Sequence, residues 1–274
     1  MNNYLNNLFN LKDKTVIITG AVGISGTAHV KAFAECGANV VITDIEQQSE
    51  KIEKLKEEIE HKFGSRCLGL IVDVSKKEDV EKMVKDVIQE FGKIDILINN
   101  AGISGKFDES KIAPIFEDYP REAWDKAWDV NMTGMFLCAQ AVGREMLKTG
   151  GGSIVNVASI HGLISPDQRV YNKGSEIKSV KPISYSVTKS AVYNFTRYLA
   201  TYWGDKNIRV NTITPGGIFD NQDSDFVKAY EYRTPMGRMA NTDDIIGPML
   251  FLCSDAASYI TGANLVVDGG LTIW

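Results

Sequence analysis

Short apolar runs alternate with charged amphipathic segments along most of the chain. The runs are rich in Val and Ile, and seven of them lie at residues 16–18, 40–42, 70–72, 94–98, 154–157, 209–213 and 265–267. Strands that alternate with helical segments predict a parallel sheet whose crossover helices cover both faces. We therefore expect an α/β fold with a doubly wound parallel seven-stranded sheet in a three-layer α/β/α sandwich, in the strand order 3-2-1-4-5-6-7.

Two of the charged segments carry clear signals for the end of a helix. Residues 46–63 are followed by Gly64 and residues 76–91 by Gly92, and glycine is the residue that a left-handed helix cap prefers. No Pro-rich or Ser-rich linker divides the chain, which contains only 7 prolines. We expect residues 1–274 to form a single domain.

Composition limits the partners of this chain. The 274 residues are 44% hydrophobic and carry a formal net charge of −5, which suffices for a sizeable core and gives no basic excess for nucleic acid. Residues 1–14 lack the apolar core of a signal peptide, and no run is long enough to span a bilayer. We expect a cytoplasmic protein that acts on a small molecule, away from membranes.

The cysteines give no sign of a disulfide or a metal site. Cys36, Cys67, Cys138 and Cys253 are widely spaced, without a CxxC pair or a nearby histidine at zinc-ligand spacing. We expect buried, reduced thiols and no bound metal.

A glycine-rich segment follows the first apolar run directly. It reads Thr-Gly-Ala-Val-Gly-Ile-Ser-Gly over residues 19–26 and leads into an apolar helix. Glycine lets backbone N–H groups approach a pyrophosphate, and the start of a helix adds its positive dipole end. Alone, the pattern also fits a glycine turn without a ligand. The residues expected to contact a dinucleotide here are Gly20, Gly23, Ile24, Ser25 and Gly26.

Asp44 strengthens the case for a dinucleotide. It ends the second apolar run, 24 residues after Gly20, where a carboxylate can accept both ribose hydroxyls of an adenosine and would repel a 2′-phosphate. Ile45 follows it, so no cation stands there for such a phosphate. The expected cofactor is NAD rather than NADP. The alternative role of Asp44 is to cap the following helix, and both roles can coexist.

Tyr185 and Lys189 lie four residues apart in an apolar helical segment, so both side chains share one face of the helix. A nearby ammonium favours the phenolate and is expected to lower the pKa of the Tyr185 phenol from its reference value of about 10. Such a phenol could exchange a proton with an alcohol while a hydride moves to or from a nicotinamide. In isolation the pair is more often structural. Tyr171 has Ser175 four residues later and no cation at this spacing.

Further motifs resemble those of the short-chain dehydrogenase/reductase family, from about residue 11 to residue 274. They read Asp-Val at 73–74, Asn-Asn-Ala-Gly at 99–102, Pro-Gly-Gly-Ile at 215–218 and Val-Asp-Gly-Gly at 267–270. The resemblance implies a Rossmann-like fold. It also implies cofactor contacts from Asp73, Val74, Asn100, Ala101, Gly102, Tyr185, Lys189, Pro215, Gly216, Gly217 and Ile218.

The same resemblance completes a catalytic tetrad of Asn131, Ser159, Tyr185 and Lys189. Tyr185 would be the general acid/base, Lys189 would tune it and hold a ribose hydroxyl, and Asn131 would support a proton relay through water. Ser159 ends the fifth apolar run, where its hydroxyl could bind the substrate oxygen. Two positions depart from the family pattern: Ile24 stands where the second glycine is expected, and Asp220 where a threonine is usual.

Two irregular stretches, about 104–120 and 161–184, are expected to be substrate loops because both follow strand ends. Their polar residues suit a hydroxyl-rich ligand, and they are Lys106, Asp108, Glu109, His161, Asp167, Gln168, Arg169, Tyr171, Asn172 and Lys173. His161 fits a backbone hydrogen bond as well as a substrate contact. Residues 198–211 and 233–240 resemble family members associated with bacterial surface-sugar biosynthesis, which implies a carbohydrate substrate.

The expected function is an NAD(H)-dependent oxidoreductase that interconverts a secondary alcohol and a ketone. Two alternatives stay open: an NADPH-type 3-oxoacyl-thioester reductase, which Asp44 disfavours, and a non-catalytic dinucleotide-binding protein, which the intact tetrad disfavours. The family resemblance further implies a homo-oligomer, a tetramer or a dimer. The apolar residues at 135–137 and 192–195 could serve an interface or the core.

Overall fold

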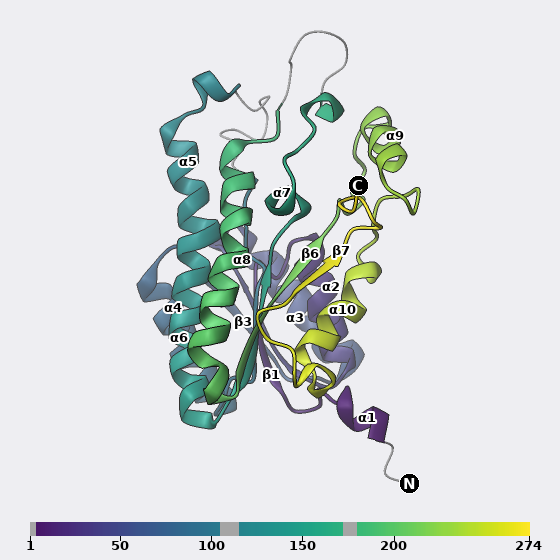
Figure 1. Ribbon diagram of the computed structural model, residues 1–274. Coiled ribbons are helices and arrows are strands. Elements are labelled where there is room, and N and C mark those ends of the chain that lie inside the picture. The colour runs from purple at the N-terminus through teal and green to yellow at the C-terminus, as the bar shows by residue number, and fades with distance from the viewer. Residues whose placement is uncertain (1–3, 105–114, 172–179) are drawn as a thin grey trace.

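One sheet of parallel strands forms the centre of the molecule (Figure 1). The structure, a computed structural model, describes residues 4–104, 115–171 and 180–274. In the described part the sheet has seven strands in the order β3-β2-β1-β4-β5-β6-β7. Their bounds are β1 Thr15–Thr19, β2 Asn39–Asp44, β3 Cys67–Ile71, β4 Ile96–Asn99, β5 Gly152–Val157, β6 Ile208–Pro215 and β7 Asn264–Val267. The predicted doubly wound sheet and its strand order are confirmed.

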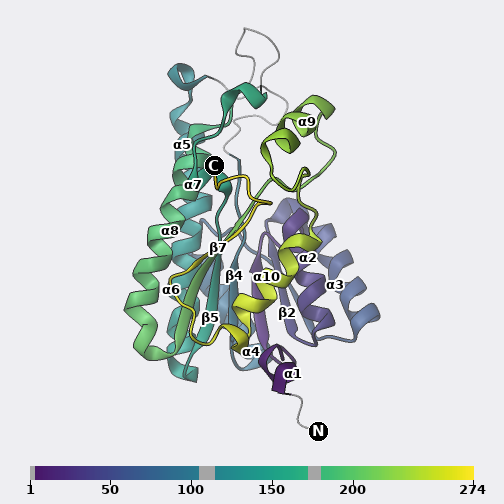
Figure 2. The same ribbon diagram turned by 45° about the vertical axis from the view of Figure 1, so that its right-hand side comes forward.

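Helices cover both faces of the sheet, and Figure 2 shows the three layers nearly edge-on. One face carries α2 (Ile24–Glu35), α3 (Ser49–Phe63) and α10 (Asp243–Cys253), and the other carries α4 (Lys77–Phe91), α6 (Gly134–Thr149) and α8 (Ile183–Trp203). Neighbouring strand residues face opposite layers. Ile18 packs with Phe33 of α2, whereas Ile17 packs in the cluster that holds Met83 of α4. Burial on both faces explains why the strands are continuous apolar runs rather than alternating ones.

Shorter elements complete the described chain. The short helices are α1 (Tyr4–Leu8), α5 (Arg121–Trp128), α7 (Ile160–Leu163) and α9 (Ser224–Arg233), and residues Asp129–Thr133 form a π-helical turn, η3, between α5 and α6. Single 3-10 turns occur at η1 Glu46–Gln48, η2 Phe116–Asp118, η4 Gln168–Tyr171, η5 Gly204–Lys206 and η6 Asp255–Ala257. In Figure 1, α7 and α9 stand above the carboxyl ends of the strands. Ligands of doubly wound sheets bind at this end.

Several predicted boundaries of helices and strands were close to the observed ones, but those of the third and fourth strands were wrong. Gly64 and Gly92 end α3 and α4 in the left-handed conformation, with φ of 65° and 77°. The third strand, predicted at residues 70–72, begins earlier at Cys67, and the fourth, predicted at 94–98, is Ile96–Asn99. Asp95 precedes β4 and its backbone still bonds to Thr15 and Ser153 of the neighbouring strands, while its carboxylate accepts a hydrogen bond from the backbone N–H of Thr15 at 2.8 Å. Hydrophobicity alone does not show this bond.

The cysteines are unpaired thiols, as expected, although only two of the four are buried. Cys138 and Cys253 lie in the core, whereas Cys36 and Cys67 are half-buried. Burial raises the pKa of Cys67, Cys138 and Cys253 to about 12, so these thiols are protonated at neutral pH. Among the described residues, no helix combines the length and the apolar character that crossing a membrane requires.

Gly143 allows α6 and α8 to approach each other. A Cβ atom at this position would lie 2.5 Å from the Trp203 ring, so we expect Gly143→Ala to lower the free energy of unfolding by about 1–3 kcal/mol through overpacking. Gly204→Ala is the matched control, because Gly204 is helical and has no atom within 4 Å of a Cβ. That control should be neutral or raise stability by up to about 1 kcal/mol. Urea unfolding measures both, and equal effects of the two variants would contradict this packing account.

Candidate active site

The glycine segment after β1 forms a tight turn that is fixed from the end of β4. Gly20 has a φ of +62°, and a Cβ there would lie 2.8 Å from the Cα of Ala101. The side-chain amide of Asn100 donates hydrogen bonds to the carbonyl oxygens of Thr19 and Gly20, both at 3.0 Å. The Thr19 hydroxyl in turn accepts hydrogen bonds from the backbone N–H groups of Asn100 and Ala101. Only glycine fits this conformation and this spacing.

The first turn of α2 meets the requirements of a pyrophosphate site. Gly23 is the N-cap of α2, and no side chain caps this helix. The first backbone N–H groups of α2 are therefore available to bind an anion. Gly26 lies so close to the turn that a Cβ would be 2.2 Å from the carbonyl oxygen of Gly20. The residues present therefore fit a dinucleotide. Ile24, the departure from the family pattern, is the first helical residue and 49% exposed.

Asp44 lies at the end of β2, beside this turn. Its carboxylate accepts hydrogen bonds from the backbone N–H of Val22 at 3.2 Å and from that of Ile45 at 2.9 Å. Gln48 is the N-cap of α3, so the alternative role of Asp44 as the cap of this helix is wrong. Through its bond with Val22, Asp44 connects the end of β2 to the glycine turn. The side chain of the next residue, Ile45, is exposed.

The Asp73–Val74 pair serves the protein framework in this structure. Asp73 accepts hydrogen bonds from the N–H and the hydroxyl of Ser75. Burial acts to raise the pKa of Asp73, but the bonds from Ser75 and the ammonium of Lys76 outweigh it, so the pKa lies below its usual value. Val74 is buried against Gly134 at the start of α6. The predicted contact of this pair with an adenine stays a prediction.

Residues 215–218 lie at the end of β6 and pack against the Tyr230 side chain. The Tyr230 hydroxyl accepts a hydrogen bond from the N–H of Gly217, and a Cβ on Gly216 would lie 2.9 Å from this hydroxyl. Ile218 pairs with Ala240 in an isolated bridge. Asp220, the second departure from the family pattern, is exposed, and its N–H donates to Gln222. The sequence did not single out Tyr230, because its contact with Gly217 depends on how α9 folds back onto the end of β6.

Ser159, Tyr185 and Lys189 meet at the carboxyl end of β5. The hydroxyl of Ser159 is hydrogen-bonded to the phenol of Tyr185 and accepts a bond from the N–H of His161. The ammonium of Lys189 donates to the carbonyl oxygen of Val157 at 2.7 Å and lies 5.9 Å from the centre of the Tyr185 ring. The end of β5 and helix α8 thus place the three groups together, with Tyr185 and Lys189 on one side of the helix, as their spacing predicted.

The expected low pKa of Tyr185 is wrong for this structure. Burial raises the pKa of the phenol, and the hydrogen bond from Ser159 opposes this only in part. The ammonium of Lys189 is bound to the Val157 carbonyl, and burial, together with the Lys181 charge, lowers the pKa of Lys189 to about 8. At neutral pH the phenol is therefore protonated and can donate a proton.

Asn131 lies in the π-helical turn η3 and is almost fully buried. Its amide oxygen accepts a bond from the N–H of Ile103 at 2.8 Å, and its amide nitrogen donates to the Ile103 carbonyl and the Thr188 hydroxyl, both at 3.0 Å. These bonds tie the end of β4 to α8. Both amide hydrogens are thus bonded within the protein, and the role of Asn131 in a proton relay stays a prediction. Thr188, which the sequence did not single out, is its partner on α8.

The loop after Ser159 turns aromatic and charged groups toward the phenol. The imidazole of His161 is hydrogen-bonded through Nε2 to the Tyr171 hydroxyl at 3.2 Å, and its ring centre lies 6.4 Å from that of Tyr185. The His161 ring is thus bonded to a side chain of the same loop rather than to the backbone, and its contact with a substrate stays a prediction. Asp167 forms ion pairs with Arg169 and with Arg233 of α9. Parts of both predicted substrate loops, with Lys106, Asp108, Glu109, Asn172 and Lys173, lie outside the described residues.

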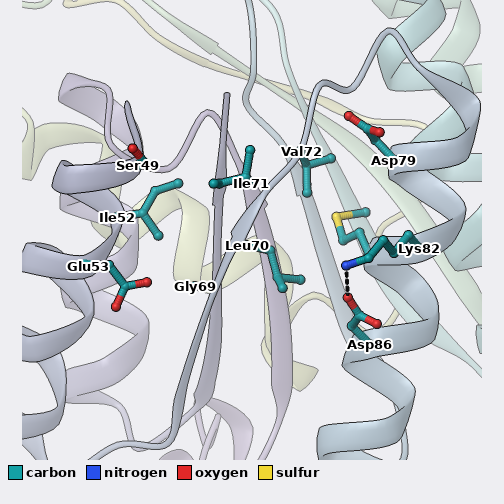
Figure 3. A pocket seen from close by; sticks show the side chains of 11 residues that line it. Ser49, Ile52, Glu53, Gly69, Leu70, Ile71, Val72, Asp79, Lys82 and Asp86 are labelled. Carbon is teal, nitrogen blue, oxygen red and sulfur yellow. Dashed lines mark hydrogen bonds and ion pairs between the residues drawn. The ribbon is translucent and has the colours of Figure 1, made fainter. Parts of the chain in front are cut away.

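A separate hollow of about 380 Å³ lies at the other edge of the sheet, between α3 and α4 (Figure 3). It is lined by carboxylates of Glu53, Asp79 and Asp86, and Lys82 is paired with Asp86 at 2.8 Å. Such a lining repels the phosphates of a dinucleotide. The described residues also contain no cluster that could hold a metal ion. The side chains predicted for catalysis and for cofactor binding lie instead at the end of β5 and at the glycine turn.

A doubly wound sheet with a serine, a tyrosine and a lysine beside a phosphate-binding turn defines a class, the dinucleotide-dependent oxidoreductases. Comparison narrows this class to one family. A family model described as enoyl-(acyl carrier protein) reductase matches residues 20–272. The chain belongs to the short-chain dehydrogenase/reductase family, and it is an oxidoreductase that acts on CH–OH groups.

Similar proteins cover nearly the whole chain. It is 38% identical to an NAD-dependent glycerol dehydrogenase of Listeria innocua, over 97% of this chain and 96% of the relative. A solved short-chain dehydrogenase from Leptospira borgpetersenii with bound NAD+ is 36% identical, with a TM-score of 0.82 over 96% of this chain and 94% of the other. A gluconate 5-dehydrogenase from Burkholderia cenocepacia, in complex with NADP and tartrate, is 28% identical, with a TM-score of 0.84 over 99% and 100%. Other relatives carry the names of threitol, mannitol and rhamnose dehydrogenases and of a 3-oxoacyl-[acyl-carrier-protein] reductase.

Burial of His161 should make the protein less stable in acid. Burial first, and then the charges of Lys181 and Arg233, lower its pKa from 6.5 to about 4. Between these values an unfolded histidine binds a proton and the native one does not, so stability is full above pH 6.5 and falls as the pH approaches 4. The shift corresponds to at most about 3 kcal/mol.

His161→Gln should therefore lose less stability than the wild type between pH 7 and pH 4.5, as measured by urea unfolding. His61→Gln, at an exposed position on α3, is the control. An unchanged acid dependence in the His161 variant would contradict the burial argument.

Proposed function

We propose that this protein is an NAD(H)-dependent oxidoreductase that interconverts a secondary alcohol and a ketone on a carbohydrate-like substrate. The observation that carries the proposal is the cluster of Ser159, Tyr185 and Lys189 at the end of β5, next to the glycine turn after β1. The names of the relatives, which include glycerol, threitol and gluconate dehydrogenases, support a polyol or sugar-derived substrate.

Each side chain of the cluster has a distinct role in this proposal. Tyr185 gives its proton to the ketone oxygen in reduction and accepts the alcohol proton in oxidation. Ser159 hydrogen-bonds the same substrate oxygen. Lys189 holds a ribose hydroxyl and supplies positive charge beside the phenol. Asn131, held between the end of β4 and α8, supports a proton relay through water. When bound, the nicotinamide supplies or accepts the hydride.

The proposed cofactor is NAD, and three groups of residues are proposed to hold it. The turn and the helix start at 20–26 bind the pyrophosphate, Asp44 binds the adenosine ribose, and residues 100–102 and 215–218 flank the dinucleotide. Asp44 supports NAD over NADP, because its carboxylate would repel a 2′-phosphate. The relatives use both cofactors, with NAD in the Leptospira structure and NADP in the Burkholderia one.

The alternative enzymatic function is that of a 3-oxoacyl-thioester reductase, since one relative is named a 3-oxoacyl-[acyl-carrier-protein] reductase. An acyl chain favours an apolar wall. The described wall beside Tyr185 instead contains His161, Lys181 and Arg233. This polarity supports a hydroxyl-rich substrate.

We further propose a symmetric homo-oligomer. Phe136 on α6 and the stacked pair Tyr198 and Tyr202 on α8 are 46%, 64% and 64% exposed, and apolar side chains gathered on one surface are typical of interfaces. Of the other residues weighed for an interface, Met135, Val192 and Tyr193 are buried in the core. The unpaired thiols suit a reducing compartment, and we propose the cytoplasm.

Tyr185→Phe is expected to lower kcat/KM by about 10²–10⁴-fold, because it removes the proton donor and acceptor. NADH binding, followed by fluorescence, should stay within about twofold of the wild type, since the ring remains. Tyr198→Phe, which removes an exposed phenol on the same helix, is the control and should retain activity. Substantial turnover of a polyol by the Tyr185 variant would refute the assignment.

Asp44→Asn keeps an acceptor for the N–H of Val22 and removes the charge beside the ribose. We expect the ratio of kcat/KM for NAD to that for NADP to fall by roughly ten- to hundredfold, the usual range for a hydrogen bond to a charged group. Asp86→Asn on α4 is the charge control. A wild-type enzyme that already prefers NADP, or a ratio that does not move, would overturn the role of Asp44.

A further inference from the structure

A second phenol, that of Tyr171, lies near Tyr185 in the segment that follows Ser159. Tyr171 is the last residue of the turn η4, and its side chain is half-buried. Its hydroxyl is hydrogen-bonded to Nε2 of His161 at 3.2 Å, and the ring centre of His161 lies 6.4 Å from that of Tyr185. One imidazole ring thus connects the Tyr171 hydroxyl to the group proposed to transfer the proton.

His161 holds the Tyr171 hydroxyl at a fixed place relative to the site. Its backbone N–H donates to the hydroxyl of Ser159 at 3.2 Å, so the imidazole starts from the same point as the proposed substrate-binding serine. Burial lowers the pKa of His161 to about 4, and the neutral ring has one donor and one acceptor nitrogen. Within residues 4–104, 115–171 and 180–274, its Nδ1 atom has no hydrogen-bond partner. The polar contact of this ring is therefore with Tyr171.

The Tyr171 ring is held from its other side by α9. Its centre lies 5.5 Å from that of Phe226, which in turn contacts Tyr230 at 6.2 Å. Burial, and then the nearby phenols of Tyr185 and Tyr230, raise the pKa of Tyr171, so it is protonated at neutral pH. A protonated phenol has one donor and two acceptor sites, and the bond to His161 uses one of them. The remaining capacity suits a neutral hydroxyl group.

We propose that the Tyr171 hydroxyl, oriented by His161, binds a second hydroxyl of the substrate, on the carbon next to the reacting carbinol. This deepens the proposed function and rests on it. The reacting oxygen must lie within hydrogen-bond range of Tyr185, so a hydroxyl one carbon away can extend toward the side that Tyr171 and His161 form. The substrate class is then a vicinal diol, or an α-hydroxyketone in the direction of reduction.

A site built to hydrogen-bond a substrate hydroxyl discriminates against the analogue that lacks it, because its own polar group is then left unpaired. Tyr171 is therefore a specificity-determining residue in this proposal. His161 is a positioning residue, since it acts through Tyr171.

The test compares two alcohols that differ by one hydroxyl, butane-2,3-diol and butan-2-ol, in steady-state kinetics with NAD. Tyr171→Phe keeps the ring that contacts Phe226 and removes only the hydroxyl. Tyr232→Phe, 89% exposed on α9, is the matched control. The wild type and the control should prefer the diol. In Tyr171→Phe the ratio of kcat/KM for the diol to that for butan-2-ol should fall by roughly three- to tenfold, mainly through KM.

Two substitutions test the positioning role of His161. His161→Leu removes the partner of the Tyr171 hydroxyl and should lower the same ratio, whereas His161→Gln keeps a side-chain donor and should restore part of it. A purely structural role would give equal effects on both alcohols. Thermal unfolding and NADH affinity equal to the wild type establish that each variant is folded.

The outcomes separate this proposal from the proposed function. If the wild type oxidises both alcohols equally well, or if Tyr171→Phe leaves the ratio unchanged, the subsite is overturned and the oxidoreductase stands. An equal fall of kcat on both alcohols with a shifted pH profile also overturns it, because Tyr171 would then act on Tyr185.

If neither alcohol turns over, binding decides. Saturation-transfer NMR then measures butane-2,3-diol on the NADH-bound protein. A weaker signal from Tyr171→Phe than from Tyr232→Phe supports the subsite while the activity on these alcohols fails, and equal signals overturn the subsite.

Discussion

The hydrogen bonds between the ends of β1 and β4 fix the geometry on which the site depends. At this point the strand order changes direction, since β1 lies between β2 and β4, and loops that leave in opposite directions open a crevice. Asn100 closes the gap by donating to the Thr19 and Gly20 carbonyls, and Thr19 accepts two backbone bonds in return. Because these polar groups satisfy one another, the turn keeps its left-handed Gly20 and leaves the start of α2 uncapped for an anion.

Burial decides the charge state of Tyr185 and Lys189, the pair proposed to transfer the proton. Removing a phenol and an ammonium from water disfavours the charged form of each, which raises the pKa of Tyr185 and lowers that of Lys189 to about 8. The resting protein therefore holds a protonated phenol, ready to donate a proton to a ketone. Alcohol oxidation needs the opposite state, so the positive charge beside the phenol matters most in that direction. The short bond from Lys189 to Val157 keeps that charge in place.

The sequence predicted the elements whose cause is local or periodic. Continuous apolar runs follow from burial on both faces, and the glycines after α3 and α4 follow from their left-handed caps. The conformation of the altered glycine turn was harder to predict, because Gly23 is the N-cap of α2 and Ile24 is its first helical residue. Lys181 and Tyr230 could not be found, since each reaches the site only through folding of an irregular segment. The predicted direction of the Tyr185 pKa shift was wrong for the same reason. The spacing shows that a cation is nearby, but the burial of the phenol appears only in the three-dimensional structure.

The arrangement separates the chemistry from the choice of substrate. Ser159 follows the end of β5 as the N-cap of α7, and Lys189 stands on α8, so both are attached to elements held by sheet and helix hydrogen bonds. The opposite wall joins the segment after Ser159 to α9 through the Asp167–Arg233 ion pair and the contact of Tyr171 with Phe226, whose ring centres lie 5.5 Å apart. Asp167 and Arg233 are both partly buried, and the bond of Tyr171 to His161 adds a further contact within this wall. Substitutions there can move the charged groups relative to the phenol while the proton-transfer groups stay in place. Such a division lets one fold keep its reaction and change its substrate.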